Sequence, residues 1–294
     1  MSRLRDVGLT ALAPAIWGST YIVTTQLLPP GVPLTVAMLR ALPAGLLLLL
    51  LVRQLPTGAW WWKSLVLGAL NFSLFWAFLF VSAYLLPGGV AATVGAVQPL
   101  IVIGLSRLVM GTPVRPLAIV AGIAGLCGVA LLVLRPGAAL DPLGVAAGLG
   151  GALSMAFGTV LSRHWKPDVS PLTFTAWQLT AGGLMLAPAA FLLEPGLPVL
   201  TAQNYAGFLY LGLIGAAFTY ILWFRGLAHI GPQAASALGF LSPLVAVLLG
   251  WSLLGQALDA VQMVGVIVVL VSVWASQRIA AAAGRKSRRP DVIG

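Results

Sequence analysis

One arginine lies inside a long apolar segment of the sequence. Residues 33–52, PLTVAMLRALPAGLLLLLLV, have the length and composition of a membrane-spanning helix, and Arg40 is the one charged residue among them. At 1.5 Å of rise per residue, Arg40 lies about 10 Å from the start of this segment. A charge at that depth is costly unless it is partnered. Arg40 therefore either has a structural role, in which it snorkels to the interface or holds backbone carbonyls of a broken helix, or it faces a cavity and binds the carboxylate of a substrate.

Aromatic residues near the centres of apolar segments form a second candidate group. They are Trp17, Tyr21, Trp76, Phe80, Phe157, Trp177, Tyr220 and Phe224. Several are four residues apart, which places two rings on one face of a helix. The pair Trp76 and Phe80 recurs in the second half of the chain as Tyr220 and Phe224. Such rings either pack against lipid or form an inward face that binds an apolar, aromatic or cationic substrate.

Two prolines interrupt apolar segments at equivalent places in the two halves of the chain. Pro99 follows Gln98, and Pro243 follows Ser242. A proline inside a helix removes a backbone donor and frees carbonyls of the preceding turn. We expect a kink or hinge at each proline, with Gln98 and Ser242 as polar contacts to a substrate. The alternative is a kink without functional consequence.

The elements that must position these residues are membrane-spanning helices. The chain has 294 residues, of which 60% are hydrophobic and 7% charged, a composition that excludes a water-soluble domain. About 20 apolar residues span a bilayer, so the sequence predicts an all-α membrane protein with ten transmembrane helices. The expected spans are residues 7–27, 33–52, 64–85, 90–109, 116–134, 143–162, 171–192, 205–225, 232–253 and 260–277.

The basic residues predict the orientation of these spans. Short cytoplasmic loops are enriched in Lys and Arg, and ten spans with both termini inside place almost every basic residue on the cytoplasmic side. Arg135 falls on the other side, and Arg40 falls within a span. The net charge of +10 does not indicate a nucleic-acid partner, because the charges are scattered singly outside the tail. The expected inside residues are Arg3, Arg5, Arg53, Lys63, Arg107, Arg115, Arg163, Lys166, Arg225, Arg278, Arg285, Lys286, Arg288 and Arg289.

The two halves of the sequence resemble each other. Residues 33–35 and 171–173 both read PLT, which places Gln178 at the position equivalent to Arg40. Residues 97–111 likewise correspond to residues 241–255. We expect a first five-helix repeat over residues 1–138, a second over 139–280 and a basic cytoplasmic tail over 281–294. Because five is odd, the second repeat must be inverted, as in many secondary transporters, whose substrate site lies between the repeats at mid-membrane.

These motifs resemble the EamA type of the drug/metabolite transporter superfamily. The resemblance rests on Gln98-Pro99-Leu100, on Ser242-Pro243-Leu244, on the stretch from Pro33 to Arg40, and on the two ends Gly111-Thr112 and Gly255-Gln256. Members often have Glu after that closing glycine, so any role of this acid does not carry over to Thr112 or Gln256. The resemblance implies export or import of small molecules such as amino acids, sugars, nucleotide sugars or drugs. The abundant aromatic residues are similar to those of aromatic amino-acid exporters of Gram-negative inner membranes.

The sequence also indicates the class of transport. No Asp or Glu lies in the middle of an expected span to carry a proton, and no glycine-rich Lys-Ser/Thr loop is present to bind ATP. Cys127 is the single cysteine, so neither a disulfide within the chain nor a cysteine metal cluster is expected. We therefore expect alternating-access transport of aromatic or bulky apolar amino acids, with no cofactor and no metal. Export of other metabolites or cationic drugs, a channel and an intramembrane enzyme are the alternatives.

The expected setting is the bacterial inner membrane, with lipid as the surrounding partner. Residues 118–128 contain three overlapping pairs of small residues four apart, a pattern that permits close helix packing within the bundle or between protomers. We expect a monomer or a weak homodimer.

Overall fold

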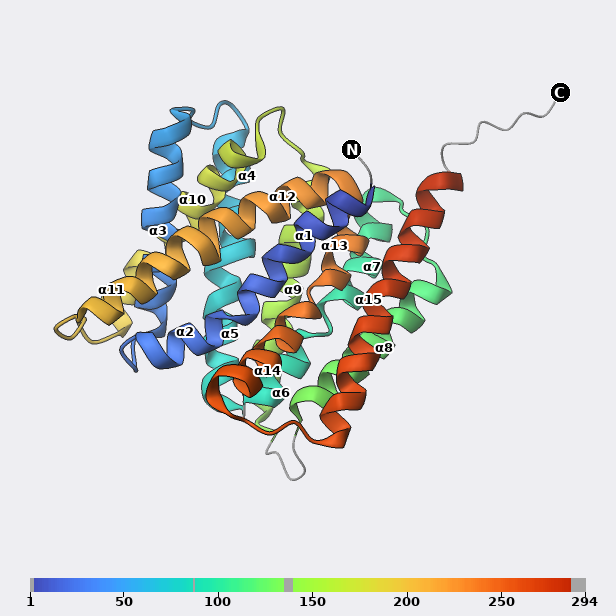
Figure 1. Cartoon of the computed structure of the whole chain (residues 1–294). Helices are drawn as coiled ribbons and strands as arrows, with labels where there is room; N and C mark the ends of the chain where they lie inside the picture. Colours follow the sequence, from blue (N-terminus) through green and yellow to red (C-terminus); the bar gives the residue numbers. More distant parts are fainter. Residues whose placement is uncertain (1–2, 87, 135–139, 287–294) are drawn as a thin grey trace.

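The computed structural model describes residues 3–86, 88–134 and 140–286. Its regular elements are all helical, and ten helical segments are long and apolar enough to cross a membrane (Figure 1). This confirms the predicted ten-helix membrane protein. The spans are Arg3–Leu27, Pro33–Val52, Trp60–Ala83, Val90–Met110, Pro116–Val133, Pro142–His164, Pro171–Leu193, Ala202–Ile230, Pro232–Leu254 and Ala260–Ala283.

Several of these spans consist of more than one helix. The α-helices (α) and π-helices (η) are α1 (Arg3–Gly18), α2 (Thr20–Leu27), α3 (Pro33–Val52), α4 (Trp60–Gly68), η1 (Ala69–Ser73), α5 (Leu74–Leu85), α6 (Gly88–Gly95), α7 (Gln98–Met110), α8 (Pro116–Val133), α9 (Pro142–His164), α10 (Pro171–Leu193), α11 (Ala202–Leu209), η2 (Tyr210–Phe218), α12 (Thr219–Ile230), α13 (Pro232–Leu238), α14 (Leu241–Leu254) and α15 (Ala260–Lys286).

The fourth and ninth spans are interrupted directly before their prolines. Helix α6 ends at Gly95 and α7 begins at Gln98, so Pro99 lies in the first turn of α7. Helix α13 ends at Leu238 and α14 begins at Leu241, so Pro243 lies in the first turn of α14. A proline in the first turn of a helix leaves no intrahelical hydrogen bond unmade. Both interruptions therefore occur where the two equivalent prolines indicated them. A hinge at either place stays a prediction.

The π-helices were not predicted. Segment η1 lies in the third span and η2 in the eighth, which are equivalent spans of the two expected repeats. A π-helical turn contains an extra residue and displaces the backbone carbonyls from their usual i+4 partners, which is why such turns are common at functional sites. These two segments provide backbone and side-chain groups for the polar contacts described below.

Helices α3 and α10 pack closely through one glycine on each. A Cβ atom added to Gly45 would lie 2.4 Å from the backbone nitrogen of Thr180, and one added to Gly183 would lie 2.7 Å from the Cα of Leu42. The pairing of 42 with 183 and of 45 with 180 shows that the helices run antiparallel. Two halves related by a two-fold axis would make such reciprocal contacts. The repeat boundaries 1–138 and 139–280, and the inversion itself, stay predictions.

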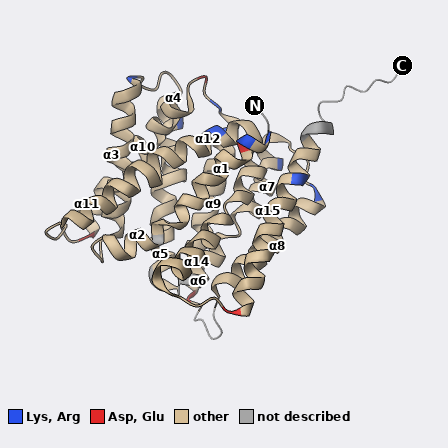
Figure 2. Cartoon of the chain, in the orientation of Figure 1, with Lys and Arg blue, Asp and Glu red and all other residues tan. Residues whose placement is uncertain are grey.

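The described basic residues gather at one end of the bundle. Figure 2 shows Lys and Arg at the end where α1 begins and where α15 finishes, whereas Arg40 lies within α3. We predict that this end is cytoplasmic. Arg135 and residues 287–294 of the expected basic tail lie outside the described residues.

Glu194 closes the first turn of α3 from the end of α10. Its carboxylate oxygens accept hydrogen bonds from the backbone N–H groups of Leu34 (2.5 Å) and Thr35 (2.7 Å). We expect Glu194→Ala to lower the free energy of unfolding by about 1 kcal/mol, because it leaves two N–H groups and the positive helix terminus uncompensated. Thermal unfolding of the detergent-purified protein measures this loss. Asp168→Ala, at an exposed position, is the control, and an equal effect of both variants would contradict the capping role.

Candidate substrate site

Arg40 is buried and holds a carbonyl of the eighth span. Its side chain is 9% exposed, and its Nη2 donates to the carbonyl oxygen of Gly215 in η2 at 2.6 Å. The guanidinium carbon also lies 5.1 Å from the centre of the Trp76 ring, within the range of a cation–π contact. These contacts match the structural interpretation of Arg40. Its role in substrate binding stays a prediction.

Four of the predicted aromatic and basic residues meet around this carbonyl. The hydroxyl of Thr219 donates to the Gly215 carbonyl at 2.9 Å and accepts a hydrogen bond from the Trp17 indole N–H, also at 2.9 Å. The Trp17 ring lies 4.9 Å from the Tyr220 ring. The arrangement is therefore a hydrogen-bonded chain from Trp17 to Arg40, with Tyr220 beside it.

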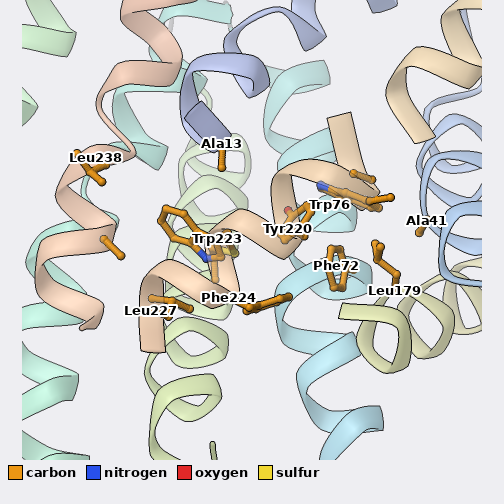
Figure 3. Close-up of a cluster of buried hydrophobic side chains, with 14 of the residues drawn as sticks. Ala13, Ala41, Phe72, Trp76, Leu179, Tyr220, Trp223, Phe224, Leu227 and Leu238 are labelled. Carbon is orange, nitrogen blue, oxygen red and sulfur yellow. The ribbon is translucent and has the colours of Figure 1, made fainter. Parts of the chain in front are cut away.

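A second path of stacked rings joins the same residues. Phe72 lies 4.6 Å from Tyr220 and 5.5 Å from Trp76, whose ring lies under Arg40. Figure 3 shows Phe72, Trp76 and Tyr220 lying together. Ring contacts and hydrogen bonds thus close a loop, so each member fixes the position of its neighbours. We call this group the arginine–aromatic cluster; it comprises Trp17, Arg40, Phe72, Trp76, Thr219, Tyr220 and the Gly215 carbonyl.

Phe224 contacts the cluster through Tyr220, whereas Trp177 makes its described contacts elsewhere. Phe224 lies 5.8 Å from Tyr220 and 5.2 Å from Phe174. The Trp177 ring lies 6.1 Å from Trp60, and its indole N–H donates to the backbone carbonyl of Gln54 at 2.7 Å. Trp177 therefore anchors the loop after α3 in this structure, and the geometry does not place it beside Arg40.

Gln178, the equivalent of Arg40, contacts the other π-helix. It is fully buried, and its Oε1 accepts a hydrogen bond from Nδ2 of Asn71 in η1 at 2.7 Å. The same Asn71 nitrogen donates to the Ser162 hydroxyl at 3.2 Å. In both halves of the chain, the polar residue of the second span of the expected repeat thus reaches a π-helix of the opposite half. Asn71 was not selected from the sequence, although an amide inside an apolar span was a usable signal.

The remaining predicted residues lie apart from the arginine–aromatic cluster or have no described contact with it. Phe80 is half-buried against the main apolar core, whereas Phe157 packs in a separate group that includes Val102 and Val160. Gln98 is half-buried, and its Nε2 has no hydrogen-bond partner within the described part of the structure. Ser242 is half-buried at the start of α14. Tyr21 lies in α2, but its side chain is outside the described part of the structure.

Sequence reasoning missed three members of this region. Phe72 and Thr219 belong to the cluster, and the fully buried Trp223 lies 5.2 Å from Trp17. The search for rings four residues apart passes over Trp223, which is three residues from Tyr220. Nothing in the sequence distinguishes Thr219 from other membrane-helix threonines.

A cavity of about 770 Å³ lies outside the cluster, between α7, α8, α13 and α15. Of the predicted site residues, Pro99 lines it. Its other lining residues are Ile103, Thr112, Pro113, Arg115, Ala118, Gly122, Arg163, Gln233, Ala237, Ser276, Ile279, Ala280 and Ala283. No group of metal-ligating side chains occurs among the residues that the structure describes.

A model described as the EamA-like transporter family matches residues 6–134 and, a second time, residues 142–276. The chain belongs to the EamA-like transporter family. It is therefore a multi-pass membrane transporter and not an enzyme.

Individual relatives agree with this assignment. Protein PecM of Dickeya dadantii is 47% identical over 280 residues, covering 95% of this chain and 94% of that protein. The uncharacterized inner membrane transporter YedA of Escherichia coli is 31% identical, covering 88% and 86% of the respective chains. A solved crystal structure superposes with a TM-score of 0.82 at 19% identity, covering 98% of this chain and 100% of that one. At that identity the crystal structure supports the fold alone.

Proposed function

We propose that this EamA-like transporter exports small metabolites that carry a carboxylate, above all aromatic or bulky apolar amino acids. The observation that supports the proposal is the arginine–aromatic cluster. A guanidinium suits a carboxylate, and the surrounding rings suit a flat or bulky apolar side chain. In the proposed cycle, the contact of Arg40 with the Gly215 carbonyl opens when the substrate carboxylate takes its place.

The proposed mechanism is alternating access, either facilitated or only weakly coupled to an ion. Within the described residues, Asp6 forms an ion pair with Arg225 at 2.7 Å near the start of α1, and Glu194 caps α3. Neither carboxylate is placed in the middle of a span, where a proton carrier would be needed, and the described Asp141, Asp168 and Asp259 lie between spans. The concentration gradient of the substrate would then set the direction of net flux. Pro99 and Pro243, at the two helix interruptions, are the proposed hinges.

The proposed setting is a bacterial inner membrane, as the name of the relative YedA suggests. The proposed oligomeric state is a monomer or a weak homodimer. The cluster also argues against a cationic drug as the main substrate, because the charge of Arg40 would repel a cation bound on the same rings. Some predicted substrate contacts are not brought to Arg40 by the structure, and they stay secondary proposals. They are Gln98, Phe157, Trp177, Gln178 and Ser242.

Counterflow in proteoliposomes tests this function. Vesicles preloaded with unlabelled phenylalanine are expected to accumulate labelled phenylalanine, and tyrosine, tryptophan and leucine are expected to compete. Acidic and sulfur amino acids, sugars and cationic drugs in the same panel are expected to compete weakly. A flux that neither saturates nor exchanges would show a channel, and preferential competition by sugars or cationic drugs would reject the proposed substrate class.

A further inference from the structure

The cavity between α7, α8, α13 and α15 has its charged residues at the basic end of the bundle. Arg115 lies just before α8, and Arg163 lies in the last turn of α9. Arg163 contacts Ala228 near the end of α12, where Arg225 pairs with Asp6 of α1, and Arg115 contacts Ile279 near the end of α15. Figure 2 shows Lys and Arg gathered at the end of the bundle where α1 begins and α15 finishes. The cavity is distinct from the arginine–aromatic cluster, since none of the members of that cluster lines it.

Two guanidinium groups in the cavity wall retain unused donors. Arg115 donates through Nη1 to the carbonyl of Ile279 at 3.3 Å, and Arg163 donates through Nη1 to the carbonyl of Ala228. A guanidinium has five N–H donors, so each of these hydrogen bonds leaves most of the group available. Across the described chain, no carboxylate forms an ion pair with either arginine. The wall contains no Asp or Glu, so these positive charges act on whatever occupies the cavity.

Neutral groups in the same wall complement the two charges. Gln233 presents a buried Nε2 that has no hydrogen-bond partner among the described residues, which costs free energy unless a ligand or water accepts from it. Thr112 and Ser276 add hydroxyl groups, whereas Ile103 and Ile279 provide apolar surface. A volume of about 770 Å³ lies within the range of small-molecule sites.

We propose that this cavity is an organic-anion site, which binds the carboxylate of a small metabolite through Arg115 and Arg163 and its apolar part against Ile103 and Ile279. The site rests on the proposed function only in that the bound anion would be the transported substrate. It would hold that substrate at the basic end of the bundle, before or after its passage through the arginine–aromatic cluster. A lipid phosphate has related chemistry, and the experiment below separates the two.

The first test measures the electrostatic preference of the cavity without any transport. In a Cys127→Ala background, Ser276→Cys places a thiol in the cavity wall. In nanodiscs of phosphatidylcholine, we expect a sulfonate-bearing methanethiosulfonate reagent to modify it about tenfold faster than a trimethylammonium-bearing one, each rate normalised to that of free cysteine. Arg163→Gln and Arg115→Gln should each reduce this preference severalfold. Arg163→Lys should retain it, since the charge remains.

Arg107→Gln is the matched control, because Arg107 lies at the same end, is exposed and donates to the Gly111 carbonyl without lining the cavity. It should leave the reagent preference unchanged. Equal rates for the two reagents in the parent protein, or equal effects of Arg107→Gln and Arg163→Gln, would overturn the proposal.

The second test identifies the occupant. Phenylacetate should slow modification of the same thiol by the uncharged reagent methyl methanethiosulfonate about tenfold, and the uncharged phenylacetamide should not. Protection by both compounds alike would overturn the anion site. If phosphatidylglycerol in the nanodisc slows modification of the thiol when no phenylacetate is present, the occupant is a lipid. That result would overturn the assignment to a free carboxylate. Labelling of the thiol needs no transport. If counterflow fails while phenylacetate still protects the thiol, the proposed function is rejected and the anion site is not.

Discussion

Replacing Arg40 by glutamine is expected to weaken binding of carboxylate-bearing substrates by about 10- to 100-fold. Hydrogen bonds to charged groups contribute roughly 1.5–3 kcal/mol to binding. Arg40 is buried within its span, and its guanidinium lies over the Trp76 ring. The fold should tolerate the change, since the Gly215 carbonyl still accepts a hydrogen bond from Thr219. Counterflow with phenylalanine, competed by phenylalanine and by phenylalaninamide, measures the loss for the acid and the amide separately.

The comparison between acid and amide decides the role of Arg40. If Arg40 binds the carboxylate, the variant should lose affinity for the acid while competition by the amide stays within about twofold. An equal loss for both compounds would assign Arg40 to structure alone, as its contacts with Gly215 and Trp76 allow. Arg40→Lys should recover part of the affinity for the acid, because the charge remains without the bidentate geometry. Arg107→Gln, at an exposed position that is not part of the arginine–aromatic cluster, serves as the control for general damage.

The ten spans were predictable because each depends on local composition. A run of about 20 apolar residues has few alternatives to a membrane helix, and prolines such as Pro33, Pro116 and Pro171 begin helices in the structure as expected. The interruptions of the fourth and ninth spans were also readable, because proline acts on the turn next to it. Orientation and inversion rest on the same local patterns and stay predictions.

The π-helices were not predictable, because their contacts come from distant parts of the chain. The carbonyl of Gly215 in η2 faces Arg40 of α3, and Asn71 in η1 faces Gln178 of α10. Equivalent positions in the two halves identified Arg40 and Gln178 as a pair of polar residues. Which backbone segment each one contacts depends on how α3 and α10 pack, and no local pattern contains that information.

The aromatic predictions show the same limit. The spacing of four residues predicted that Tyr220 and Phe224 share one helix face, and in the structure their rings are in contact. It does not indicate which helices meet, so Phe157 was grouped with rings that it does not contact, and Phe72 was left out. Trp177 was selected because it lies nearer the centre of its expected span, but it donates to the loop carbonyl of Gln54.

Substituting alanine for Gly45 or Gly183 is expected to cause the largest loss of stability. The added methyl group would overlap the backbone of the facing helix, at 2.4 Å from Thr180 N or 2.7 Å from Leu42 Cα, and backbone atoms in a packed helix cannot move aside as a side chain can. Overpacking of this kind costs roughly 1–3 kcal/mol and occasionally more. Thermal unfolding and size-exclusion profiles in detergent measure the effect. Gly104→Ala is the matched control, since a Cβ there meets nothing within 4 Å in α7.

The control separates packing from helix propensity. Alanine favours a helix over glycine by about 1 kcal/mol, so Gly104→Ala should leave stability equal or raise it, while Gly45→Ala and Gly183→Ala lower it. Both glycines lie in the contact between α3 and α10, and either substitution alone would already separate these helices. The double variant should therefore lose less stability than the sum of the two single losses. If Gly45→Ala unfolds at the same temperature as the parent protein, the two helices are not in backbone contact. The reciprocal arrangement around α3 and α10 would then have to be abandoned.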